Sequence, residues 1–153
     1  MPERRTSAGM GRSNIPDSMN AHEAFAAIAL VAVACDGSLD TQEAKALRIQ
    51  LEGRSPYRSL SDDTMGTLFD GLLTRLRQEG WQSLLDAALP VLTAAQQETA
   101  IALAAQLIHC DRVVEPQERE LLARMAEHGQ LPPGRAEQII AVIEVLNRDS
   151  LAS

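Results

Sequence analysis

Two segments of this chain share a pattern in which a run of apolar residues ends at a cysteine and passes directly into an acidic turn. The first run, Ala24 to Cys35, has no polar side chain before the thiol and leads into CDGSLDTQE, while the second leads into CDRVVEPQE. The copies align over residues 24–51 and 99–126 at a constant offset, the separation of Cys35 and Cys110. This internal repeat favours two related units that bury their apolar faces together.

Each copy of the repeat predicts a helix, an acidic turn and a second helix. The leading runs are apolar on every side, which is typical of helices in the middle of a bundle. The second helix of each copy has apolar residues at helical spacing, namely Ala44, Leu47 and Leu51 in one copy and Leu121, Leu122 and Met125 in the other.

The rest of the chain favours helices as well. Apolar stripes run from Met65 to Leu76 and from Trp81 to Ala88, and we expect Gly80 and Pro90 to end them. The closing stripe consists of Ile139, Ile140, Ile143 and Leu146. We therefore predict an all-α fold, a single-domain bundle of about seven helices built from two pseudo-symmetric repeats.

Composition sets the domain organisation and excludes several partners. Residues 1–18 are rich in Gly, Ser, Arg and Pro, which predicts a disordered N-terminal tail before a helical domain at 19–153, with RSPYRS as a linker inside that domain. The 21 acidic and 14 basic residues give a net charge of −7, which disfavours nucleic acid and anionic membranes. The apolar runs are too short to span a bilayer, and two cysteines fit a reducing cytoplasm.

The acidic residues of the two turns are candidate metal ligands. If the repeats pack about a pseudo-twofold axis, both turns face one cleft. Oxygen-rich ligation there suits calcium, magnesium or manganese, and His109 would add a nitrogen for zinc or manganese. The candidate ligands for such a divalent cation are Asp36, Asp40, Glu43, Asp111, Glu115 and Glu118.

Helix capping is an alternative interpretation of the same carboxylates. Asp40, Glu43, Glu115 and Glu118 lie where helices are expected to begin, so their oxygens would accept hydrogen bonds from free N–H groups and favour the positive dipole end. Capping explains the two aspartates that follow the cysteines less well, because the C-terminal end of a helix disfavours a carboxylate. Either the next helix's N-terminus or a bound cation would compensate them.

Four neighbouring residues modify this hypothesis. Arg112 stands where the first turn has Gly37, and its guanidinium can neutralise the second turn, so we expect any cation site mainly in the first. His109 is expected to be a hydrogen-bonded residue at a helix boundary rather than a ligand. Cys35 and Cys110 are expected in buried, alanine-like positions where burial raises the thiol pKa, with a redox role as the alternative.

The paired turns resemble those of the TerB-like tellurite-resistance family, in which each of two helical halves carries an ADG turn followed by an acidic residue and a Glu. The resemblance covers about residues 20–148, with matches at Asp36, Gly37, Asp40 and Glu43 in the first turn and at Asp111, Glu115 and Glu118 in the second. It implies a bacterial stress-associated protein that acts with other tellurite-resistance proteins, with suspected metal binding and no established enzymatic activity.

Three classes of function follow from these features. The first is a non-enzymatic, cytoplasmic stress module whose acidic cleft binds a divalent cation or a basic protein segment. The second is a metal-independent protein-interaction or co-chaperone-like adaptor, and a homodimer is compatible with both. An enzyme is the least favoured, because the three histidines, at 22, 109 and 128, lie beside no recognisable nucleophile or phosphate-binding loop.

Overall fold

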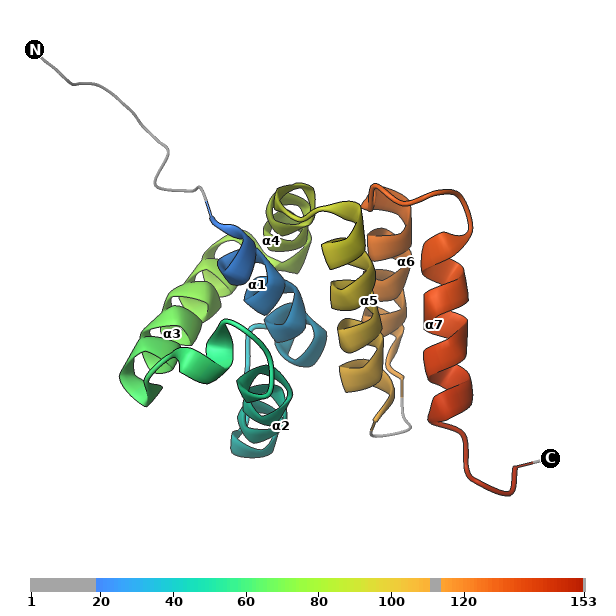
Figure 1. Cartoon of the computed structure of the whole chain (residues 1–153), viewed down its shortest axis with the longest axis horizontal. Coiled ribbons are helices and arrows are strands. Elements are labelled where there is room, and N and C mark those ends of the chain that lie inside the picture. The colour runs from blue at the N-terminus through green and yellow to red at the C-terminus, as the bar shows by residue number, and fades with distance from the viewer. Residues whose placement is uncertain (1–18, 111–113, 153) are drawn as a thin grey trace, which may run out of the picture.

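The computed structural model describes residues 19–110 and 114–152, and within them the chain forms seven α-helices with two short 3₁₀ turns, η2 (Tyr57–Ser59) and η3 (Leu89–Val91). The predicted all-α class and the expected number of helices are confirmed. The helices are α1 (Ala21–Ala34), α2 (Thr41–Glu52), α3 (Asp62–Glu79), α4 (Trp81–Ala88), α5 (Ala94–His109), α6 (Pro116–His128) and α7 (Arg135–Leu146) (Figure 1).

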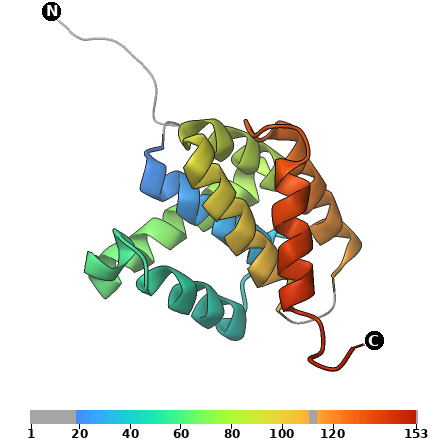
Figure 2. The same cartoon turned by 45° about the vertical axis from the view of Figure 1, so that its right-hand side comes forward.

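Helices α1 and α5 form the centre of the bundle. They pack against each other, and every other α-helix contacts one of them (Figures 1 and 2). Both are rich in alanine, and Ala26, Ala27, Ala104 and Ala105 are completely buried. Small side chains allow the backbones of neighbouring helices to approach closely, because they leave little between the axes. The prediction that the two apolar runs are buried helices packed on a shared core is confirmed.

The remaining helices cover the central pair on different sides. Helices α2, α3 and α4 contact α1, while α6 and α7 contact α5. Each sequence repeat therefore forms a pair of helices joined by a short turn, α1 with α2 and α5 with α6. The pseudo-twofold relation between the pairs stays a prediction.

Capping residues fix where the two central helices begin. Asn20 caps α1 and Thr93 caps α5, each in a reciprocal pair with the residue three positions on. Thr93 Oγ1 accepts a hydrogen bond from Gln96 N–H at 3.2 Å, while Gln96 Oε1 accepts from Thr93 N–H at 2.9 Å. This reciprocal pair is a capping box at the start of α5.

Helix α7 is less buried than the closing stripe of the sequence predicts. Ala136 is its only buried residue, and Ile139, Ile140 and Ile143 are partly buried against the core. Leu146, which the sequence places on the same apolar stripe, is 68% exposed. The helix ends there, with Asn147 as its C-cap, and the Asn147 side chain donates a hydrogen bond to Gln106 Oε1 on α5 at 2.7 Å.

The segment RSPYRS is not a simple linker. It contains η2, whose Tyr57 is 2% exposed. The Tyr57 ring lies 6.3 Å from the Phe25 ring, measured between centroids, and its hydroxyl donates a hydrogen bond to the His22 carbonyl. The sequence missed this anchor because a single aromatic residue beside a proline has no periodicity.

Gln97 joins three segments inside the core. Its side chain is completely buried on α5, and its Nε2 donates to the Leu89 carbonyl at 2.8 Å and the Leu92 carbonyl at 3.3 Å. Its Oε1 accepts from Gln130 N–H at 2.7 Å. The amide thereby holds η3 and the end of α6 at fixed positions on α5.

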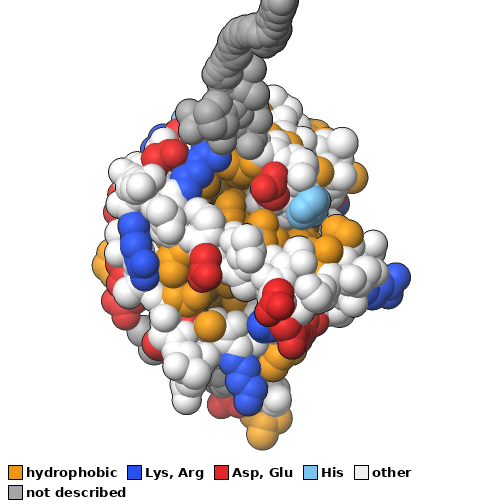
Figure 3. Space-filling model, turned by 90° about the vertical axis from the view of Figure 1, so that its left-hand side faces the viewer, with side chains coloured by type: hydrophobic (Ala, Val, Ile, Leu, Met, Phe, Trp, Pro, Cys, Tyr) orange, Lys and Arg blue, Asp and Glu red, His pale blue; other side chains and the backbone are white. Residues whose placement is uncertain are grey.

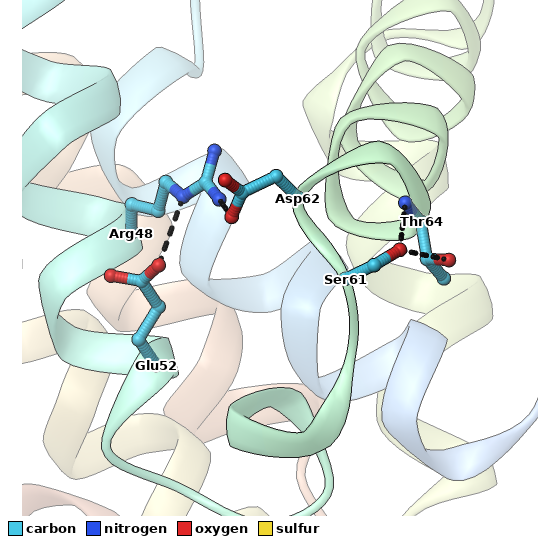
Figure 4. A network of polar contacts seen from close by, with 5 residues as sticks. All are labelled: Arg48, Glu52, Ser61, Asp62 and Thr64. Atoms are coloured by element: carbon cyan, nitrogen blue, oxygen red, sulfur yellow. Dashed lines mark hydrogen bonds and ion pairs between the residues drawn. The ribbon is translucent and has the colours of Figure 1, made fainter.

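Helices α2 and α3 are joined by a polar network at the surface (Figure 4). The Arg48 guanidinium pairs with Glu52 at 3.2 Å and with Asp62 at the start of α3. Ser61 caps α3, because its Oγ accepts a hydrogen bond from Thr64 N–H at 3.1 Å. These contacts place the α2–α3 connection against α1.

The predicted tail, residues 1–18, lies outside the described residues. The described chain starts at Met19, just before the α1 N-cap Asn20. None of the helices in residues 19–110 and 114–152 combines the length and apolarity needed to cross a bilayer.

Candidate functional site

The first acidic turn joins α1 to α2, and two of its candidate ligands act as helix caps. Asp40 Oδ1 accepts a hydrogen bond from Glu43 N–H at 2.7 Å, and Glu43 Oε1 accepts from Asp40 N–H at 3.1 Å. This reciprocal pair satisfies two backbone donors at the start of α2. The capping interpretation of Asp40 and Glu43 is confirmed.

Asp36 is engaged in a turn of its own. Its Oδ1 accepts hydrogen bonds from the Ser38 amide at 3.0 Å and the Ser38 hydroxyl at 2.9 Å. These two bonds, the amide bond first, hold the pKa of the exposed Asp36 carboxyl below its usual value. Its position after a helix is therefore stabilised by the turn itself.

A positive charge from α3 also reaches this turn. Arg77 Nε donates a hydrogen bond to the Gly37 carbonyl at 2.9 Å. Gly37 has φ +86, so any side chain there would be strained by the backbone conformation, and its Cβ would lie in contact with Arg77 Cγ at 3.4 Å. No sequence pattern indicates Arg77, because it lies 40 residues further along the chain.

The second turn is described only in part. Asp111 and Arg112 lie outside the described residues, so the proposed neutralisation of this turn by Arg112 stays a prediction. Glu118 Oε1 accepts a hydrogen bond from Glu115 N–H at 2.9 Å at the start of α6. Glu115 and Glu118 therefore lie at a helix N-terminus, as their capping interpretation predicts.

Carboxylates from both repeats affect the pKa of the Cys35 thiol. The thiol is partly buried at the end of α1, and burial raises its pKa. The negative charges of Asp36 and then Glu118 raise the pKa further. Glu118 lies in the first turn of α6, in the second repeat. The start of α6 is therefore close enough to Cys35 for the Glu118 charge to act on the thiol.

Two sequence expectations for the end of α5 need correction. Cys110 was expected to be buried, but it is exposed; it follows the last residue of α5, and its Sγ donates a hydrogen bond to the Leu107 carbonyl at 3.2 Å. His109 was expected to be hydrogen-bonded at a boundary, but it is 9% exposed and its Nε2 has no hydrogen-bond partner among the described residues.

The candidate ligands do not converge within the described part of the chain. Among residues 19–110 and 114–152, no group of three or more His, Cys, Asp and Glu side chains is arranged to hold a metal ion. Asp36, Asp40 and Glu43 share the first turn, Glu115 and Glu118 share the start of α6, and Asp111 falls outside the description.

A groove of about 870 Å³ lies between the start of α1, the η2 segment and the start of α5. This volume falls within the range of ligand-sized sites in proteins, about 300–1,000 Å³. Its apolar surface comes from Phe25, Tyr57, Leu92 and Ala95. Polar groups line its edges, namely Asn20, His22, Arg54, Ser55, Gln96 and Thr99.

Contacts between its three walls fix the shape of the groove. Tyr57 holds η2 to α1 through Phe25 and the His22 carbonyl, and burial raises the Tyr57 pKa, so its hydroxyl stays protonated as a donor. The Arg54 guanidinium carbon lies 5.9 Å from the centre of the Phe25 ring, a cation–π distance. Figure 3 views the side of α3 and η2, where hydrophobic side chains are exposed in hollows between charged and polar ones.

The sequence missed this groove, because its walls come from three segments that no single periodicity connects. Comparison of the chain with protein-family models, curated proteins and solved structures gives no match. The function therefore has to be argued from the geometry of the chain itself.

Proposed function

We propose that this protein is a non-enzymatic, cytoplasmic protein-interaction module that holds a segment of another protein in the groove between α1, η2 and α5. The observation that carries the proposal is a ligand-sized groove with an apolar floor and polar edges. Such surfaces recognise peptides by accepting apolar side chains while the edges orient the chain. A metal-independent adaptor function is thus better supported than a cation-binding stress module.

The hydrogen bonds within the first acidic turn also favour the adaptor function over cation binding. Asp36, Asp40 and Glu43 each accept hydrogen bonds within their own turn. A cation would have to compete with these bonds or share the oxygens. The groove needs no such rearrangement, because Ala95 and Thr99 on its α5 wall are exposed.

Peptide display tests the proposal. Peptides selected on the full-length protein should bind the parent and lose at least tenfold in affinity when Ala95→Trp fills the groove from an exposed helix position. The matched control is Ala141→Trp, an exposed alanine on α7. Equal loss with both variants, or none with either, would show that the groove is not the recognition site.

A divalent cation is the second candidate, and two observations favour it. His109 Nε2 is buried without a hydrogen-bond partner among the described residues, and the charges of Asp36 and Glu118 both act at Cys35. A cation-binding function would also agree with the TerB-like resemblance and with the tellurite-stress role that the resemblance implies. Zinc, manganese and calcium titrations by calorimetry test it. Binding that His109→Gln weakens supports a site that includes the imidazole, and no heat of binding for any of the three ions contradicts it.

A further inference from the structure

The groove carries a charge opposite to that of the protein as a whole. The chain has a net charge of −7, yet among the described residues that line the groove none is Asp or Glu. Arg54 is the one Arg or Lys in this described lining, and the nearby Glu23 carboxylate already accepts a hydrogen bond from the Asn20 N–H. A partner that enters this groove therefore meets the positive charge of Arg54 on an acidic molecule.

Arg54 is placed to receive an anion. Its guanidinium lies over the Phe25 ring and forms no ion pair with any residue in 19–110 or 114–152. A guanidinium without an ion-pair partner can donate two N–H groups to the two oxygens of a carboxylate.

The wall of the groove formed by α5 also favours a negatively charged ligand. Ala95 and Gln96 lie in the first turn of α5, whose N-terminus borders the groove. The partial positive charge of a helix N-terminus favours a nearby negative group. The accessible apolar surface of the groove comes from the partly buried Phe25 and the exposed Ala95, so the complementary ligand combines an apolar side chain with a carboxylate.

We propose that the groove binds a protein segment in which an aromatic or aliphatic side chain neighbours an Asp or Glu, the side chain packing on Phe25 and the carboxylate pairing with Arg54. This inference rests on the proposed function and specifies the chemistry of its partner. A peptide is favoured over a small acid because the groove is open along a surface formed by three segments, which suits an extended chain.

Two labelled probe peptides test the inference by fluorescence anisotropy on the full-length protein. In one, glutamate alternates with phenylalanine and leucine, and in the other glutamine replaces every glutamate. We expect the acidic peptide to bind about tenfold more tightly at low salt, as a charge-assisted hydrogen-bonded pair predicts. Arg54→Gln should remove this difference by weakening the acidic peptide alone, while Arg148→Gln, an exposed arginine beyond α7, should preserve it.

Added salt provides a second measurement that does not depend on a variant. The affinity of the acidic peptide should fall as salt screens the pair, while that of the glutamine copy should stay constant. Equal affinity of the two peptides would overturn the acidic preference and leave peptide recognition by the groove intact. Absence of binding by both would overturn the preference and the proposed function together. Binding of decanoate that depends on Arg54, without peptide binding, would assign the groove to small amphipathic acids instead.

Discussion

Replacing Gln97 with leucine removes a buried polar connection while keeping nearly the same volume. The Gln97 amide donates to the carbonyls of Leu89 and Leu92 and accepts from the Gln130 amide. The Leu89 carbonyl keeps a partner in the variant, because it also accepts from Leu92 N–H at 3.1 Å. Two backbone groups, the Leu92 carbonyl and the Gln130 amide, lose their partner in Gln97.

The expected magnitude follows from those two groups. A buried donor or acceptor that loses its partner costs about 1–3 kcal/mol, and the part-buried Gln130 amide regains some solvent contact. The leucine side chain returns part of this cost, because it buries more apolar surface than the amide does. We expect Gln97→Leu to lower the free energy of unfolding by about 2–3 kcal/mol.

Urea denaturation followed by circular dichroism measures this difference, with Gln138→Leu as the matched control. Gln138 is exposed on α7, so the same chemical change there should alter the free energy of unfolding by less than about 0.5 kcal/mol. A Gln97→Leu protein as stable as the parent, with an unchanged m-value, would refute the reasoning, because the amide would then contribute no more than an apolar side chain.

Three further predictions concern packing, pH and the thiol. Ala104→Leu should destabilise the fold by about 1–3 kcal/mol in urea denaturation, because Ala104 is completely buried in α5, whereas exposed Ala141→Leu should be nearly neutral. Arg124 on α6 hydrogen-bonds to Asp86 and lowers the pKa of the Asp86 carboxyl, so the stability lost in Asp86→Asn should be constant above about pH 5. That loss should shrink as the pH falls below about 4 and vanish only below the lowered pKa of Asp86 in the folded protein. In a protein without the second cysteine, Glu118→Gln should lower the pKa of Cys35 and speed its alkylation at pH 8; an unchanged rate would place Glu118 too far away to act.

Local sequence determined the helices and their starts. The capping pairs Asp40 with Glu43 and Thr93 with Gln96 lie three residues apart, so the chemistry that starts α2 and α5 is contained in a few consecutive residues. An apolar run that is hydrophobic on every side also has to be covered on every side. For that reason the central position of α1 and α5 could be predicted without knowing which helices cover them.

Contacts between distant segments decided the rest. Gln97 meets Gln130 and Arg77 meets Gly37 only because helix packing brings these residues together, and polar side chains of this kind carry no periodic signal. The repeat alignment could not show the exposure of Cys110, because Cys35 and Cys110 each directly follow the last residue of their helix, yet Cys35 is partly buried and Cys110 is exposed.

The groove is the clearest case of what tertiary structure alone decides. Phe25, Arg54 and Leu92 lie on three separate segments, and each by itself has the sequence appearance of an ordinary helix or loop residue. Sequence patterns report which face of an element is apolar, because that is set by local periodicity. A concave surface with a cation beside an aromatic ring depends on how the elements are placed relative to one another, and only the packed chain defines that placement.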